Sequence, residues 1–213
     1  RRLNMKKIVS IVFASIIFTT SAFAGGLIGL KLGNGELEAT RAEIVNTPTT
    51  LNEAADTQNV DHLYGAIFGE LNINDGPLNL GFELVPLSGT ISVATDNTDA
   101  SAEVGNLRTV YALAAREVGG GSVYAKLGYS EADIDNAKQS AGGTTITSFT
   151  DALEGPMIGI GFQTGEYNGL VFRAEATLTE FDDVEVKTTD ADGLVETKKA
   201  NDIEFQTFTL SVA

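Results

Sequence analysis

Apolar residues alternate with small or polar residues over long stretches of this chain, and the clearest example lies at residues 155–183. In its first half, Ile160 and Phe162 belong to an apolar series that alternates with glycines. In its second half, Arg173 and Glu175 belong to a polar series that alternates with apolar residues. A period of two residues is typical of β-strands with one apolar face. This stretch therefore predicts two long strands joined by a tight turn.

The same pattern recurs along the chain and predicts an all-β protein. The predicted strands are residues 26–32, 63–73, 78–84, 106–117, 122–131, 155–163, 170–179 and 203–213. Short segments rich in Gly and Asn join some neighbours, at residues 74–77, 118–121 and 164–169. Long polar loops are expected between the others, at residues 36–62, 88–105, 132–151 and 182–202. The first of these loops also allows a helical turn at residues 51–56.

The first 24 residues have the pattern of a secretory signal peptide. Lys6 and Lys7 supply a positive start, residues 8–18 form an apolar core, and Ala24 ends a small-x-small cleavage site. Translation is expected to start at Met5, so that residues 1–4 precede the protein itself. Export through the Sec pathway of a bacterium follows from this prediction.

The mature chain, residues 25–213, is predicted to be an eight-stranded antiparallel up-and-down transmembrane β-barrel of the bacterial outer membrane. Strands of roughly 10 residues, tilted by about 40°, cross an apolar band of about 25 Å, whereas soluble strands more often have about 5–6 residues. Connections that alternate between short and long also fit such a barrel. A soluble secreted barrel that binds an apolar ligand stays open as an alternative, because the alternation is the same when the apolar face points inward.

The polar face of the predicted strands would line the interior. Eight strands enclose a space that side chains can just fill, and buried charges are costly unless they are paired. A plug of paired charges is therefore expected rather than an open pore, with a narrow diffusion channel as the alternative. The predicted lumen network consists of Lys31, Glu70, Glu83, Arg108, Arg116, Lys126, Arg173 and Glu175. Rearranged pairs of Lys126, Arg173 and Glu175 would open the alternative channel.

The alternation is less clean in residues 63–73, where Phe68 falls on the same face as Glu70. In residues 106–117, one series alternates regularly with the other. The series that includes Tyr111 and Leu113 is more apolar and is predicted to face lipid. The series that includes Arg108 and Arg116 is then predicted to face the lumen.

The last strand carries the predicted assembly signal on its lipid face, at Phe208, Leu210 and Val212. Upstream, Ile203 and Phe205 fall in the opposite phase. Either a bulge near Gln206 or a strand end that rises above the apolar zone would explain this change of phase.

Three segments, VYAKLGYS, GPMIGIGFQ and LVFRAEATLTEFDD, resemble the last third of the OmpA-like and OmpX-like small outer-membrane barrels. The resemblance covers residues 123–183 and implies that Lys126, Arg173 and Glu175 face inward. It also implies that periplasmic chaperones and the barrel-assembly machinery are partners. Members of this family commonly end in an aromatic residue, whereas this chain ends in Ala213.

Composition narrows the possible partners and chemistry. The chain has 213 residues with 29 acidic and 14 basic ones, a net charge of −15, and this excess of acids argues against nucleic-acid binding. The acidic loops are expected to be solvated and to form the contact surface for a surface ligand. Outer-membrane lipid and lipopolysaccharide are the other expected partners.

The chain is not expected to be an enzyme or to hold a cofactor or metal. A lipid A deacylase of this size would need a histidine beside a serine and an acid, but His62 is the single histidine and there is no cysteine. The acids at residues 182–185 and 190–192 suggest calcium only weakly, because the remaining ligand spacing is missing. A structural or surface-interaction role, in membrane integrity or adhesion, is therefore the predicted function.

Overall fold

The computed structural model describes residues 25–46, 50–51, 56–86, 89–95, 98–140, 145–189, 193 and 195–213. Antiparallel strands and turns make up these residues, and none of them lies in a helix. Within these ranges there is consequently no helix with the length and apolar character needed to cross a membrane. The predicted signal peptide lies outside the described residues.

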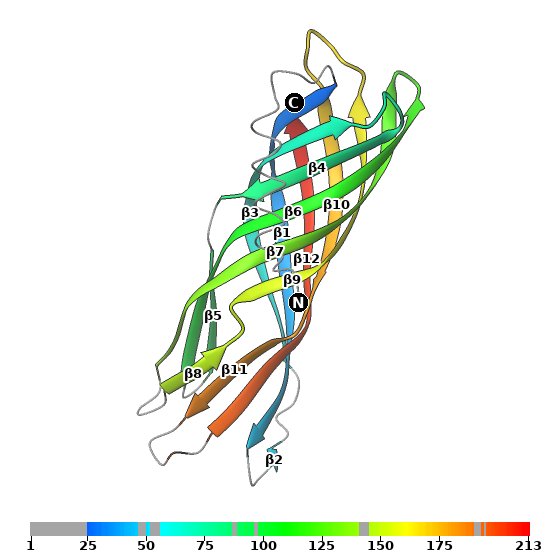
Figure 1. Cartoon of the computed structure of the whole chain (residues 1–213). Coiled ribbons are helices and arrows are strands. Elements are labelled where there is room, and N and C mark those ends of the chain that lie inside the picture. The colour runs from blue at the N-terminus through cyan, green and yellow to red at the C-terminus, as the bar shows by residue number, and fades with distance from the viewer. Residues whose placement is uncertain are drawn as a thin grey trace.

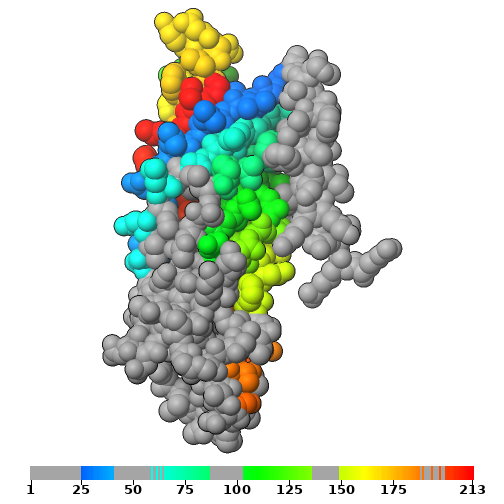
Figure 2. Space-filling view, turned by 90° about the vertical axis from the view of Figure 1, so that its left-hand side faces the viewer, coloured from blue at the N-terminus to red at the C-terminus, as the bar shows by residue number. Residues whose placement is uncertain are grey.

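Eight strands form a closed ring, which confirms the predicted fold class (Figure 1). Each pairs with the next in an antiparallel ladder, and β12 pairs back with β1, with Leu30 opposite Val212. The ring strands are β1 (Gly26–Asn46), β3 (Asp56–Asn72), β4 (Leu78–Val85), β6 (Thr98–Val118), β7 (Gly121–Ser140), β9 (Ala152–Thr164), β10 (Phe172–Phe181) and β12 (Val195–Val212). Figure 2 shows β1, β3, β4, β6 and β7 following one another across one side of the barrel.

Short turns gather at the end of the barrel that holds the C-terminus (Figure 1). Asn74 and Asp75 have φ angles of 56° and 50° in the β3–β4 turn, and the β6–β7 turn uses Gly119 and Gly120 with φ of 57° and 87°. Tight hairpin turns need such positive φ values, which Asn, Asp and Gly adopt most readily. The predicted short turns are therefore confirmed.

The opposite end differs from the prediction, because long hairpins replace much of the expected polar loops (Figure 1). β1 continues to Asn46 and β6 already begins at Thr98. Four further short strands extend the sheet: β2 (Thr50–Leu51) pairs with β1, β5 (Gly89–Thr95) with β6, β11 (Val184–Thr189) with β12, and β8 (Thr145–Phe149) with β11. The expected helical turn falls mostly on residues 52–55, which lie outside the described residues, while its ends, Leu51 and Asp56, lie in strands. Thr- and Val-containing polar segments extend a ladder readily, which explains the difference.

The apolar face of the ring points outward and the charged face points inward. Leu30, Leu127 and Ile160 are 59%, 66% and 69% exposed, whereas Lys31 and Lys126 are only 4% and 2% exposed. A soluble barrel would show the reverse arrangement. The lipid-facing orientation predicted from the sequence therefore agrees with the fold.

Strand β6 is the exception, and its predicted faces were assigned the wrong way round. Tyr111 and Leu113 are 5% and 1% exposed inside the barrel, while Ala112 and Ala114 point outward. Tyr111 pairs with Gly81 on one neighbouring strand and with Gly128 on the other. Because these two glycines leave space inside the barrel, the tyrosine ring packs there rather than against lipid.

Strand β12 keeps a single phase from Ile203 to Ser211, so there is no bulge near Gln206. The irregularity lies four residues further toward the hairpins, at Asp202, which has a φ of 49°. Because the alternation is unbroken, Ile203 and Phe205 face the interior like Thr207 and Thr209, beyond the outward apolar residues. The strand end that rises above the apolar zone is thus the correct explanation.

Candidate functional site

The centre of the lumen holds four charges that alternate in sign. Lys31 Nζ lies 2.5 Å from Glu83 Oε2 and 2.5 Å from Glu175 Oε1. Lys126 Nζ lies 3.1 Å and 3.2 Å from the same two oxygens. β1, β4, β7 and β10 each supply one of these residues, so the ion pairs connect both sides of the ring. None of the four side chains is more than 5% exposed.

A second ion pair lies closer to the short turns. Arg173 binds Glu70 through two bonds, Nη1 to Oε1 at 2.6 Å and Nη2 to Oε2 at 2.8 Å. The hydroxyl of Tyr111 donates to Glu70 Oε1 at 2.8 Å, and the amide of Asn79 donates to Oε2 at 3.2 Å. Bidentate guanidinium–carboxylate pairs are among the strongest hydrogen-bonded contacts in proteins.

Aromatic rings fill the space around the charges. Lys126 Nζ lies 3.8 Å from the centre of the Tyr111 ring, and the guanidinium of Arg173 lies 5.3 Å from Phe68 and 5.5 Å from Tyr124. These distances are in the range of cation–π attraction. Tyr124 also donates to Glu175 at 3.0 Å. The rings add packing to the ion pairs, so the plug is solid as well as neutral.

Glycines on the neighbouring strands make room for these rings. Phe68 pairs with Gly29, Tyr111 with Gly81 and Tyr124 with Gly161. A Cβ atom added at any of these glycines would collide with the facing ring. The inward glycines of the sequence are therefore part of the plug and do not mark open space.

Six residues of the predicted network are brought together, and they are called the charged layer below. The charged layer consists of Lys31, Glu70, Glu83, Lys126, Arg173 and Glu175. Its three cations balance its three carboxylates. Pairing of every member explains how these charges tolerate burial.

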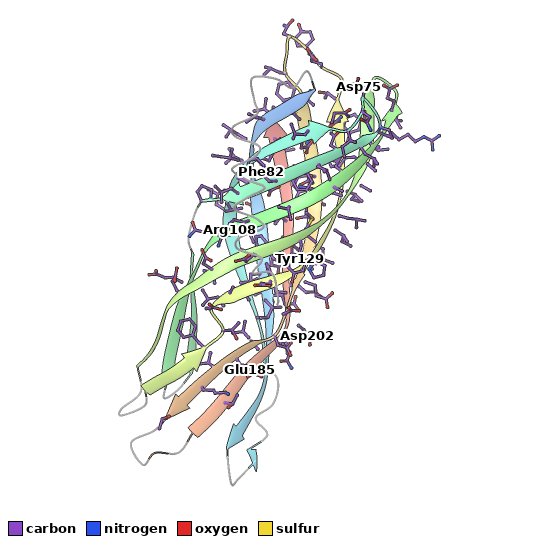
Figure 3. The ribbon with its side chains drawn as sticks, in the orientation of Figure 1. Asp75, Phe82, Arg108, Tyr129, Glu185 and Asp202 are labelled. Carbon is purple, nitrogen blue, oxygen red and sulfur yellow. The ribbon has the colours of Figure 1, made fainter. Side chains whose placement is uncertain are left out.

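Arg108 and Arg116, the other two predicted members, do not belong to this layer. Arg108, labelled in Figure 3, lies on the outward face of β6, which it shares with Val110. Its Nη2 lies 2.5 Å from Asp133 Oδ1. Arg116 is exposed near the short turns. Both predictions were wrong for the same reason, which is the inverted phase of β6. Tyr111 was missed for that reason too, and glycines at matching positions of neighbouring strands were the signal that could have found it.

The remaining predicted residues occupy positions outside the lumen. Phe208 and Leu210 are 59% and 60% exposed on the outward face of β12, and Val212 shares that face. Their role as an assembly signal stays a prediction. No group of three or more potential metal ligands occurs among the described residues. The acids at 190–192 and the side chain of His62 lie outside the described part of the structure.

Hydroxyl groups follow the charged layer toward the long hairpins. Thr109 and Ser130 hydrogen-bond at 2.8 Å, and Thr177 and Thr207 at 2.6 Å. A cavity of about 10 Å³ lies among them, close to the room that one water molecule needs. Its lining consists of Glu83, Leu107, Thr109, Lys126, Met157, Thr177, Thr179, Phe205 and Thr207.

Comparison with solved structures defines the class of this fold. The outer membrane protein OprG from Pseudomonas aeruginosa matches with a TM-score of 0.61 and 11% identity, over 88% of this chain and 96% of its own. Ail, the attachment invasion locus protein of Yersinia pestis, matches with a TM-score of 0.43 and 11% identity, over 88% of this chain and 97% of its own. No protein-family profile and no curated sequence matches the chain. The chain therefore has the fold of a small outer-membrane β-barrel, while the finer resemblance to OmpA and OmpX stays a prediction.

Proposed function

We propose that this protein is a structural or surface-interaction barrel of the bacterial outer membrane, with a closed lumen. The observation that carries the proposal is the charged layer, in which the ion pairs connect opposite walls and leave no unpaired member. A lumen filled in this way is suited to a scaffold. The extended hairpins are then the surface that contacts other molecules.

The outward face supports a location in the membrane. Ile28, Leu30 and Leu32 on β1 are all more than half exposed. Because water would penalise so much exposed apolar surface, a bilayer is the environment that this face fits. The proposed partners are outer-membrane lipid and lipopolysaccharide. Sec export, periplasmic chaperones and the barrel-assembly machinery belong to the same proposal.

The hairpin end is the proposed contact surface for a ligand or a neighbouring cell component. Asp135, Asp151, Asp182, Asp183 and Asp202 are exposed there. A cluster of exposed carboxylates favours a cationic partner. The proposed work of these hairpins is adhesion or support of membrane integrity.

Gel mobility of refolded protein tests the membrane-barrel proposal. Residues 25–213, refolded in detergent, are loaded with and without boiling. We expect the two samples to migrate differently, because a closed ring of paired strands resists SDS until it is heated. Identical migration, together with solubility in plain buffer, would contradict the proposal.

A narrow diffusion channel is the second candidate function. Lys31 and Lys126 contact the same two carboxylates, Glu83 and Glu175, so one lysine could leave while the other keeps both acids paired. Planar-bilayer recordings distinguish the two candidates. The closed scaffold predicts that the unmodified protein gives no single-channel current, and regular current steps would favour the channel.

A further inference from the structure

Beyond the hydroxyl groups, apolar side chains close the lumen a second time. They form two contiguous clusters that share Leu107 and Phe205 as packing partners. All eight ring strands contribute, each with at least one inward residue. This apolar layer consists of Leu37, Ala66, Val85, Leu107, Ile134, Leu153, Phe181, Ile203 and Phe205.

The order of the layers is the same along separate strands. On β10 the inward residues run from Arg173 and Glu175 through hydroxyl groups to Phe181. On β12 they run from Thr207 to Phe205 in the same direction. The small cavity lies between, since its lining includes residues of both layers.

We propose that the charged layer and the apolar layer are two independent barriers in series, with a sealed chamber at the small cavity between them. The inference rests on the proposed closed lumen and goes further, because it assigns the exclusion of ions to the apolar layer. The ion pairs of the charged layer are therefore not the sole barrier to the passage of ions.

The physical reason is that the two layers stop an ion in different ways. Side chains of the charged layer fill the cross-section and satisfy one another, so an ion gains nothing by entering. The apolar layer offers no hydrogen-bonding group, so an ion would lose its hydration without compensation. Opening one layer leaves the other intact.

A single cysteine at Thr179 reports on the chamber, since the chain contains no cysteine of its own. Thr179 lines the cavity and is 3% exposed. In refolded Thr179→Cys protein a charged, water-soluble thiol reagent is expected to react slower than at the exposed control Asp183→Cys by on the order of 10³-fold, because reaction requires local opening.

Two neutral double variants open the layers separately. Lys31→Ala with Glu83→Ala removes one cation and one carboxylate from the charged layer. Leu153→Ala with Phe181→Ala removes bulk from the apolar layer. In either background we expect labelling of Thr179→Cys to accelerate by at least about tenfold, because either opening connects the chamber to water. Rapid labelling in the parent background would overturn the sealed chamber.

Planar-bilayer recordings of the same backgrounds test the barriers in series. Neither double variant alone is expected to conduct, whereas the combined quadruple variant is expected to show current steps. Current through Lys31→Ala with Glu83→Ala alone would show that the apolar layer is no barrier. A silent quadruple variant that retains heat-modifiable mobility would equally contradict the proposal. Current through the unmodified protein would instead reject the closed lumen, and thus the proposed function itself.

Discussion

At the residue scale, each buried charge of the lumen depends on particular partner residues. Glu70 meets Arg173, Tyr111 and Asn79 at once, and Glu175 meets both central lysines. Such contacts offset the loss of hydration only while each partner is present. Substitution of a single buried charge is therefore expected to lower the stability of the protein strongly.

Replacing Glu70 by Ala leaves the guanidinium of Arg173 buried without its carboxylate. We expect a loss of about 3–5 kcal/mol in the free energy of unfolding, measured by urea titration of refolded protein in detergent. The exposed Glu166→Ala is the matched control and should stay within about 0.5 kcal/mol of the parent. A double variant, Glu70→Gln with Arg173→Met, should recover part of the loss, and equal losses in both variants would argue against the ion pair.

Adding a methyl group at Gly81 tests the close packing of Tyr111. Gly81→Ala forces its Cβ against the tyrosine ring, and overpacking of this kind costs about 1–3 kcal/mol. Combining it with Tyr111→Leu should give less destabilisation than the two single losses added together. Thermal unfolding followed by gel mobility measures each variant, and strictly additive losses would show that the two residues do not interact.

At the scale of elements, the choice of which strand face points inward decides which side chains contact one another in the lumen. Two adjacent positions in β6, Ala112 and Leu113, are both apolar, yet Ala112 points outward and Leu113 into the barrel. The pairing partners of the strand set this difference, because Gly81 and Gly128 leave interior space only beside the Tyr111 phase. Hydrophobicity of the strand by itself favours the wrong face.

Single cysteines at these two positions test the phase of β6. In protein reconstituted into vesicles, Ala112→Cys should react with a lipid-soluble maleimide, because its side chain contacts the acyl chains. Leu113→Cys should stay unlabelled, because its side chain is 1% exposed inside the barrel. The opposite labelling pattern would restore the face assignment based on hydrophobicity.

Across the whole molecule, hydrophobicity changes sides along the barrel axis. Nearer the short turns, outward residues such as Leu210 are apolar and inward residues such as Ser211 are polar. Near the hairpins the inward Ile203 is apolar and the outward Glu204 is charged. Asp75 and Asp202 mark these two regions in Figure 3. The change of sides indicates where the bilayer ends and water begins.

Tryptophan substitutions locate that boundary, because the chain contains no tryptophan. Leu32→Trp lies within the outward apolar band, whereas Glu36→Trp lies two outward positions further along β1. We expect brominated lipid to quench the fluorescence of Leu32→Trp strongly and that of Glu36→Trp weakly. Equal quenching at both positions would place the boundary higher on the barrel.

The sequence by itself determined the number of ring strands, their antiparallel order, the short turns and most of the inward charges. These features depend on local alternation and on turn residues such as Asn74 and Gly119, which can be recognised in the sequence alone. Only the tertiary structure decided which face of β6 points inward, and therefore that Arg108 and Arg116 lie outside the lumen. It also decided that charged, hydroxyl and apolar groups form successive layers. Those features depend on register, because a side chain takes its place according to what the neighbouring strand leaves free. The Tyr111 ring packs inward for this reason, since Gly81 and Gly128 become its neighbours only when the ring closes.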